Sequence, residues 1–418
     1  MKIAKAGFVS PDHNFRYGFV AIAISVFVFA YSTRFGQVSV LAYYALWLPL
    51  VLIDYRHSLG NYAKFYWIIA FGLLAVLSVF WSAAPGVTAR AGVQYMSHIV
   101  CALIAARTMN VRTMTLGMLA GVCLVVLYSL AFGGYHYDPI DGGYSFVGAF
   151  ASKNLLGFFS SLGIYFAFAC LFILRERGLW RLLGFVCAGL AGYALIASQS
   201  ATSIIATAGT LGLMVGLSVI FLFAPRTRKA LLLAGLLLGL GLAFVGLNFG
   251  GIDLLLGAFG KDSTLTGRTY LWAEGLEAAR QSPIFGVGYQ AYWVQGFSEA
   301  ERLWEEFYIG SRSGFHFHNT YIEVLVELGF VGLALLTLIV VRVPVGHLMR
   351  ILDDRDDRAS HVMFGIAAML LLRSFFEVDV LHPYAIGSFM LYYAAGLLAT
   401  SQSTRRLVSR QRLQAHHA

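Results

Sequence analysis

The chain has 418 residues, of which 59% are hydrophobic and only 12% charged, and its formal net charge is +9. A soluble domain carries about 25% charged residues, so this composition excludes an ordinary soluble protein. Apolar runs of about 20 residues recur along the chain, and each is long enough to cross a bilayer as a helix. The sequence therefore predicts an all-α polytopic integral membrane protein.

The positive charge lies mainly in short connections between apolar runs, as the positive-inside rule predicts for cytoplasmic loops, and this argues against nucleic acid as a partner. Window reading gives about 12 transmembrane helices, and the run at 92–106 is short enough to be re-entrant. The predicted spans are 17–33, 38–53, 65–82, 92–106, 113–133, 150–174, 182–198, 202–223, 230–249, 320–341, 361–377 and 383–400.

Alternation from a cytoplasmic N-terminus gives the organisation of the chain. We expect an N-terminal transmembrane block (1–249), a large outer loop with an amphipathic helix (250–319), C-terminal transmembrane helices (320–400) and a basic cytoplasmic tail (401–418). The four cysteines fall in or beside apolar runs without CxxC spacing, which predicts packing residues rather than a metal site or disulfides. They are Cys101, Cys123, Cys170 and Cys187.

The outer loop contains an arginine that opens an amphipathic segment. Arg268 follows Gly267, and the segment runs from Thr269 to Gln281, before Pro283. Its apolar residues recur at helical spacing, which predicts a helix on the membrane surface. The Arg268 guanidinium could bind two oxygens of a lipid phosphate at once. The alternative is a surface arginine on a polar loop.

Two histidines stand where the loop re-enters the apolar region. His318 is a candidate general base, because imidazole titrates near neutrality; the alternative is a histidine that only caps or hydrates a helix end. His316 lies two residues earlier. A His-x-His pair can bind metal, but further ligands at a suitable spacing are lacking, so no metal is expected.

Ionisable residues inside the predicted spans are costly to bury and are therefore candidates for function. Glu323 and Glu327 lie four apart, with Asn319 one turn before, and form one polar stripe on a helix. Arg373 and Glu377 are also four apart. They either pair and lock two helices together, or Arg373 faces a cavity and meets an anionic substrate.

Three cations are predicted to lie at the same outer level of the membrane. Lys153 begins one span, and it joins Arg268 and Arg373 at this level. Such a cluster suits a diphosphate, which carries several negative charges into a medium of low dielectric constant. Chance convergence is the alternative, because any outer face has some cations.

These residues carry a resemblance to a known family. The chain resembles the superfamily of O-antigen ligases and Wzy-type polysaccharide polymerases over roughly residues 145–395. It is most similar to the succinoglycan-type exopolysaccharide polymerase branch. The matching stretches are Thr266–Trp272, Ser282–Gly288, His318–Tyr321, Glu327–Gly332, Ser152–Asn154 and Arg373–Asp379.

The resemblance implies a GT-C-type, inverting, metal-independent glycosyltransferase without a cofactor. It implies that the chain lies in a bacterial inner membrane, with both termini cytoplasmic and residues 250–319 periplasmic. The expected activity is transfer of a glycan from polyprenyl diphosphate to the next lipid-linked repeat unit. The expected partners are undecaprenyl-diphosphate-linked oligosaccharide, the lipid bilayer and a chain-length co-polymerase.

The resemblance also implies roles for individual residues. His318 would activate the acceptor hydroxyl, and Arg268 would hold the diphosphate, with Arg373 and Lys153 as helpers. Five further residues are expected to support the site; they are Asn319, Tyr321, Glu323, Glu327 and Glu377, with His316 beside them.

The chain departs from the family pattern at two places. Ala201 stands where many members have a basic residue, and Ser152 stands where a histidine is usual before the Lys-Asn step. The first change puts one phosphate contact in doubt. Two other activities stay open: an O-antigen ligase or protein O-oligosaccharyltransferase, and, in another class, a flippase or transporter of lipid-linked oligosaccharide. A transporter would predict internal symmetry and charges at the bilayer midplane.

Overall fold

The computed structural model describes residues 5–60, 62–138, 143–248 and 267–400. Most of these residues are helical. The tail predicted at 401–418, the part 250–266 of the predicted outer loop and Thr266 of the family motif lie outside the described residues.

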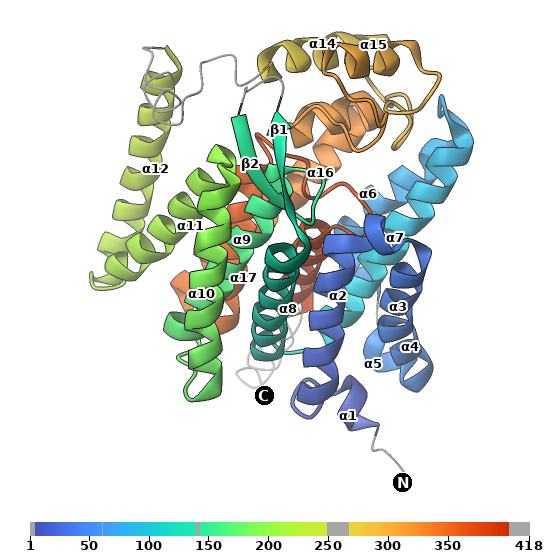
Figure 1. Cartoon of the computed structure of the whole chain (residues 1–418). Helices are drawn as coiled ribbons and strands as arrows, with labels where there is room; N and C mark the ends of the chain where they lie inside the picture. Colours follow the sequence, from blue (N-terminus) through green and yellow to red (C-terminus); the bar gives the residue numbers. More distant parts are fainter. Residues whose placement is uncertain (1–4, 61, 139–142, 249–266, 401–418) are drawn as a thin grey trace, which may run out of the picture.

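The first half of the described chain is a succession of helices that run up and down the molecule, interrupted by one β-hairpin (Figure 1). The elements are α1 (Ala6–Val9), α2 (Phe15–Phe35), α3 (Gln37–Trp47), α4 (Pro49–Ile53), α5 (Tyr55–Ser58), the 3-10 helices η1 (Tyr62–Phe65) and η2 (Ser78–Phe80), α6 (Tyr66–Leu77), α7 (Pro85–Thr108), α8 (Val111–Phe132), β1 (Gly134–Asp138) and β2 (Gly143–Gly148).

The second half adds the remaining helices of the bundle and two helices that lie across one end of it (Figure 1). The elements are α9 (Lys153–Phe168) with the π-helical turn η3 (Ala169–Ile173), α10 (Leu179–Ser198), α11 (Ala201–Ile220), α12 (Pro225–Asn248), α14 (Arg268–Gln281), α15 (Ser298–Glu306), α16 (Thr320–Asp353), α17 (Arg358–Arg373) and a last helix Ile386–Thr400.

The apolar runs found in the sequence are helical in the structure, which confirms a polytopic membrane protein. Seven helices within the described ranges are long and apolar enough to cross a membrane. They are Phe15–Phe35, Tyr55–Phe80, Val111–Phe132, Lys153–Ile173, Leu179–Ser198, Ala201–Ile220 and Thr320–Asp353. A helix covers most of each of the other predicted runs, but the total of about 12 spans stays a prediction.

Two boundaries differ from those predicted. The helix around the short run 92–106 begins earlier, at Pro85, because proline fits the first turn of a helix, where its missing N–H would be unpaired anyway. The helix predicted over 361–377 ends at Arg373, so Glu377 lies in the connection that follows it. Arg373 and Glu377 therefore do not lie on one helix, although the predicted span 361–377 contained both.

Two buried histidines inside the bundle have hydrogen-bond partners at both ring nitrogens, as a low-dielectric interior favours. His98 bonds to the Tyr43 hydroxyl through Nδ1 (3.0 Å) and to the Ala385 carbonyl oxygen through Nε2 (3.1 Å). His347 bonds through its two ring nitrogens to Ser360 and to the Ala394 carbonyl oxygen, both at 3.1 Å. These two histidines are structural. All four cysteines are free and buried, as the sequence predicted.

A second, smaller hydrophobic core lies under α14 and α15, at the end where the β1–β2 hairpin also lies (Figure 1). We call residues 267–319 the lid. Its core contains Leu271, Trp304 and Phe317, and it packs on Ile322 at the start of α16. The buried stripe of α14 is Leu271, Gly275 and Ala279, and the apolar residue Leu276 is exposed. The lid is thus a packed layer seated on α16.

Candidate active site

The segment that carries His318 is held in place from several sides. Asn319 caps α16, because its side-chain oxygen accepts from the backbone N–H groups of Tyr321 (3.0 Å) and Ile322 (3.2 Å). The Phe317 carbonyl oxygen accepts from Trp272 Nε1 at 2.9 Å. The His318 backbone has a φ of 52°, a left-handed conformation that is uncommon outside glycine and is found at functional sites.

His318 faces a carboxylate from the connection after α17. Its Nδ1 lies 3.4 Å from Glu377 Oε2, and its side chain is 23% exposed, against 5% for Glu377. A carboxylate at Nδ1 favours the tautomer in which Nδ1 carries the proton, so Nε2 can accept one. This is the arrangement expected of a general base with an orienting acid.

Arg268, the first residue of α14, contacts the other oxygen of the same carboxylate. Its Nη2 donates to Glu377 Oε1 at 2.9 Å, and its Nη1 donates to the Phe376 carbonyl oxygen at 2.9 Å. Nη1 also lies 3.5 Å from Thr202 Oγ1 on α11. These bonds use three of the five N–H groups of a guanidinium within the described part of the chain. The other two N–H groups have no partner among the described residues and could donate to a ligand.

Burial and charge set the protonation of this site. Burial lowers the pKa of His318, and the Arg268 guanidinium lowers it further, while Glu377 acts in the opposite direction. Burial alone would raise the pKa of Glu377, but Arg268 and then His318 hold it below its usual range. At neutral pH the site therefore contains a neutral imidazole, an anionic carboxylate and a cationic guanidinium.

Arg373 lies deeper, and its charge is already paired. Its Nε donates to Asp379 Oδ2 at 2.6 Å, and its Nη2 to Asp379 Oδ1 at 3.2 Å. Nη1 donates to Ser203 Oγ at 2.9 Å, and the side chain is 1% exposed. The sequence left two possibilities for Arg373: an ion pair that holds two helices together, or a contact to an anionic substrate. The ion pair fits these contacts better, although the partner is Asp379 and not Glu377. At 1% exposure the side chain leaves almost no surface open to a phosphate.

The first turns of four helices, α9, α11, α14 and α16, meet around the cluster of His318, Glu377 and Arg268. His318 and Asn319 precede α16, Arg268 begins α14, and its guanidinium reaches Thr202 in the first turn of α11. Ser200, just before α11, donates to Asn154 Oδ1 in the first turn of α9 at 2.9 Å. Each helix N-terminus carries about half a positive elementary charge, although Asn319 and Ser152 cap α16 and α9. Their combined field favours an anion.

The three predicted cations, Lys153, Arg268 and Arg373, can now be located relative to these helix starts. Lys153 is the first residue of α9, beside Asn154, and so it lies on the same side of the bundle as the start of α11. Ala201, where a cation is missing from the family pattern, is the first residue of α11. Arg268 and Arg373 contact the two residues that follow it, Thr202 and Ser203. Both arginines therefore flank the position where the resemblance predicts a cation.

The remaining supporting residues hold the site together. Glu323 accepts from Phe317 N (2.8 Å) and Trp293 Nε1 (2.9 Å), so it ties the His318 segment to the lid. The Tyr321 hydroxyl accepts from Ser374 Oγ at 2.9 Å. Glu327 is buried one turn below Glu323. The sequence stripe of Asn319, Glu323 and Glu327 is thus structural support and does not line the cluster around His318.

His316 lies beside His318, with ring centroids 4.2 Å apart, and its Nδ1 accepts from the His318 backbone N–H at 3.0 Å. Burial lowers the pKa of His316, and His318 lowers it further. Ligand atoms of His316, His318 and Glu377 lie within 4.8 Å of one another, a spacing compatible with a metal ion. The ion pair from Arg268 to Glu377 would oppose a metal cation there.

Comparison with known proteins places this arrangement in a family. A family model described as O-antigen ligase matches residues 186–337. The exopolysaccharide production protein ExoQ of Rhizobium meliloti (strain 1021) is 60% identical over 406 residues, which cover 97% of this chain and 93% of that protein. The chain belongs to the O-antigen ligase family. The resemblance found in the sequence is thereby confirmed.

Two glycine motifs of the O-antigen ligase resemblance meet each other in space. Gly329 breaks α16 with a φ of 62°, and the segment Pro283–Gly288 lies along the break. The backbone bonds are Gly288 N to Glu327 O (2.9 Å) and Phe330 N to Pro283 O (2.8 Å). A Cβ atom at Gly286 would lie 2.3 Å from the Glu327 carbonyl carbon. Glycine is needed because two backbones touch here.

Sequence reasoning missed two residues near this candidate site, Asp379 and His382. Asp379 lies in the stretch Arg373–Asp379 that carries the family resemblance. Its ion pair with Arg373 crosses a turn, so no helical or strand spacing in the sequence indicates it. His382 lies near His316, with ring centroids 6.4 Å apart, and bonds to Gln290 at 3.1 Å; burial lowers its pKa to about 4. The family model ends at residue 337, so Glu377 lies beyond its match.

Proposed function

We propose that this protein is a polysaccharide polymerase of the bacterial inner membrane. It transfers a glycan from polyprenyl diphosphate to the next lipid-linked repeat unit on the periplasmic face. The observation that carries the proposal is the chain of contacts Arg268–Glu377–His318 at the boundary between the lid and the membrane helices. The 60% identical relative is named for exopolysaccharide production, which favours a polymerase among the activities of the family.

The proposed reaction is an inverting displacement at the anomeric carbon of the donor sugar. A hydroxyl oxygen of the acceptor forms the new bond to this carbon, while the bond from the carbon to the diphosphate oxygen breaks. The hydroxyl proton passes to Nε2 of His318, whose depressed pKa keeps it neutral at neutral pH. Glu377 orients the ring and balances the imidazolium that forms.

The leaving diphosphate keeps the bonding electron pair, and its growing charge must be stabilised. The free donors of Arg268 and the N-termini of α9, α11, α14 and α16 supply positive potential without a metal ion. Lys153 is proposed as a further contact, whereas Arg373 is proposed to hold the first turn of α11 in place through Ser203. The long lipid anchors the donor, so the protein has to orient only its head group.

The experiment is a transfer assay with purified wild type and His318→Ala, each given a defined repeat unit linked to polyprenyl diphosphate. A ladder of products on a gel from wild type, absent from His318→Ala, is the expected result. A single glycan joined to lipid A core or to protein would instead make the enzyme a ligase. If wild type transfers glycan to none of these acceptors, the result would favour the transporter hypothesis instead.

A further inference from the structure

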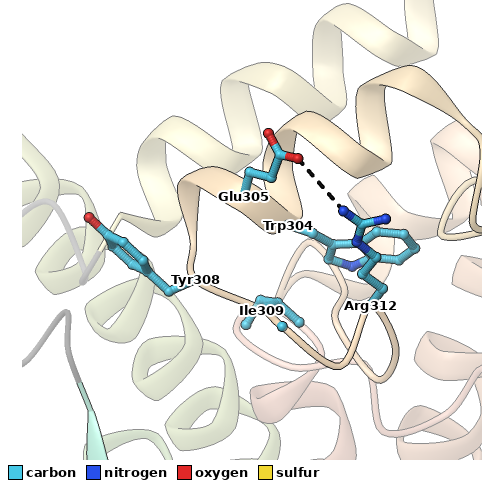
Figure 2. A pocket seen from close by; sticks show the side chains of 6 residues that line it. Trp304, Glu305, Tyr308, Ile309 and Arg312 are labelled. Carbon is cyan, nitrogen blue, oxygen red and sulfur yellow. Dashed lines mark ion pairs between the residues drawn. The ribbon is translucent and has the colours of Figure 1, made fainter.

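The lid carries a pocket of about 310 Å³ outside the cluster described above. It lies where α15 ends and the chain turns back towards His318 (Figure 2). It is lined by Trp304, Glu305, Tyr308, Ile309, Gly310 and Arg312. Its walls thus combine two aromatic rings with one acid and one base.

The two aromatic side chains of this pocket are unusual in exposure and in hydrogen bonding. Tyr308 is 75% exposed, although its ring is large and mostly apolar. Trp304 is 1% exposed, and its indole N–H finds no acceptor among the described residues. A buried N–H without an acceptor is unfavourable, so a ligand oxygen that reached it would stabilise the pocket.

The charged side chains of the pocket lie at its rim, where ion pairs hold them in place. Arg312 Nη1 lies 2.9 Å from Glu301 Oε2, and Arg312 Nη2 lies 3.7 Å from Glu305 Oε1, the pair drawn in Figure 2. The backbones of Tyr308 (φ 57°) and Arg312 (φ 45°) are both in the left-handed region. Such strain in residues other than glycine persists only where surrounding packing maintains it, and it concentrates at functional sites.

A layer of aromatic side chains joins the pocket to the candidate active site. Phe307 directly precedes Tyr308 and stacks on Tyr270 of α14, with ring centroids 6.3 Å apart. Phe307 also packs on Phe315 (5.3 Å), and Phe315 packs on His318 (6.0 Å). The pocket therefore lies to one side of the reacting groups, separated from them by these rings.

We propose that this pocket is a carbohydrate subsite, which holds sugar residues of the substrate at a distance from the diphosphate. A sugar ring offers an apolar C–H face to an aromatic ring such as Tyr308, and hydroxyls that both donate to a carboxylate and accept from a guanidinium or an indole N–H. The charged pair at the rim disfavours a lipid-facing role for Tyr308. The inference rests on the proposed function, because it takes the substrate to be a glycan.

The test measures binding without chemistry. The lipid-free repeat-unit oligosaccharide is titrated into purified wild type, Tyr308→Ala and Arg312→Gln, and binding is followed by saturation-transfer NMR. Wild type is expected to bind, and either substitution should weaken binding about tenfold, as the loss of one aromatic or charged contact implies. Tyr55→Ala is the matched control and should bind like wild type, because Tyr55 is an exposed residue of α5, which lies at the opposite end of the molecule from α15 (Figure 1).

Arg268→Ala separates this proposal from the transfer reaction, because it should still bind the free oligosaccharide. Absence of binding by wild type, or equal binding by wild type and both pocket variants, would overturn the subsite even if the transfer assay gives a ladder. Binding that is lost in the pocket variants supports the subsite even if no transfer is found.

Discussion

Replacing Glu377 by glutamine tests whether one carboxylate serves both His318 and Arg268. The substitution keeps the shape and removes the charge. The bond from Arg268 at 2.9 Å is a charge-assisted bond between largely buried groups, with side chains 12% and 5% exposed. Making its acceptor neutral costs about 1 to 2 kcal/mol. The contact to His318 at 3.4 Å is at the edge of hydrogen-bonding distance and adds less than about 1 kcal/mol.

Together these terms come to about 2 kcal/mol, which corresponds to a rate of transfer about 30-fold lower. The assay is the initial rate of product formation from lipid-linked repeat units, with the amount of folded protein matched by gel filtration. Glu277→Gln is the matched control, because Glu277 is exposed and pairs only with Arg280 within the described residues. Wild-type activity in Glu377→Gln would refute the role assigned to this carboxylate.

Three further expectations follow from the same geometry. The pKa of His318 is lowered, and the neutral imidazole is the active form. The rate of transfer should therefore be constant above neutral pH and should fall on acidification with an apparent pKa below 6.5. A rate that still changes with pH above pH 7 would contradict this. Gly286→Ala should destabilise the protein by about 2 to 3 kcal/mol, because the new methyl group meets the α16 backbone. The measurement is the thermal unfolding temperature, which should fall. Gly86→Ala is the control, because there is open space around Gly86. Transfer should survive EDTA, and strict dependence on an added divalent ion would instead assign His316, His318 and Glu377 to a metal site.

The elements around the site could be predicted where local chemistry determines them. The structure has α14 at Arg268–Gln281, against a predicted helix of Thr269–Gln281, because apolar spacing and Pro283 define it. It has α16 beginning at Thr320, where Asn319 provides an N-cap. Hydropathy alone located the helices of the bundle, because a bilayer demands length and apolarity.

The pairing of charges could not be predicted in the same way. Residues four apart meet only if the helix continues through both, and α17 ends at Arg373, which leaves Glu377 free to turn towards Arg268. The convergence of four helix N-termini depends on contacts between residues 46 and 66 positions apart in the sequence, and no local pattern records it. The β1–β2 hairpin was missed because it is short and stands between two strong apolar runs.

The most direct test of this account is the binding of polyprenyl diphosphate, the leaving group of the proposed reaction. Wild type, Arg268→Ala and His318→Ala would each be reconstituted in lipid nanodiscs, and binding would be followed by phosphorus NMR. The account predicts that Arg268→Ala loses affinity by at least about tenfold, while His318→Ala binds like wild type and yet transfers no glycan. Equal affinity of wild type and Arg268→Ala would contradict the assignment of Arg268 to the diphosphate, and glycan transfer by His318→Ala would contradict the assignment of His318 to the proton transfer.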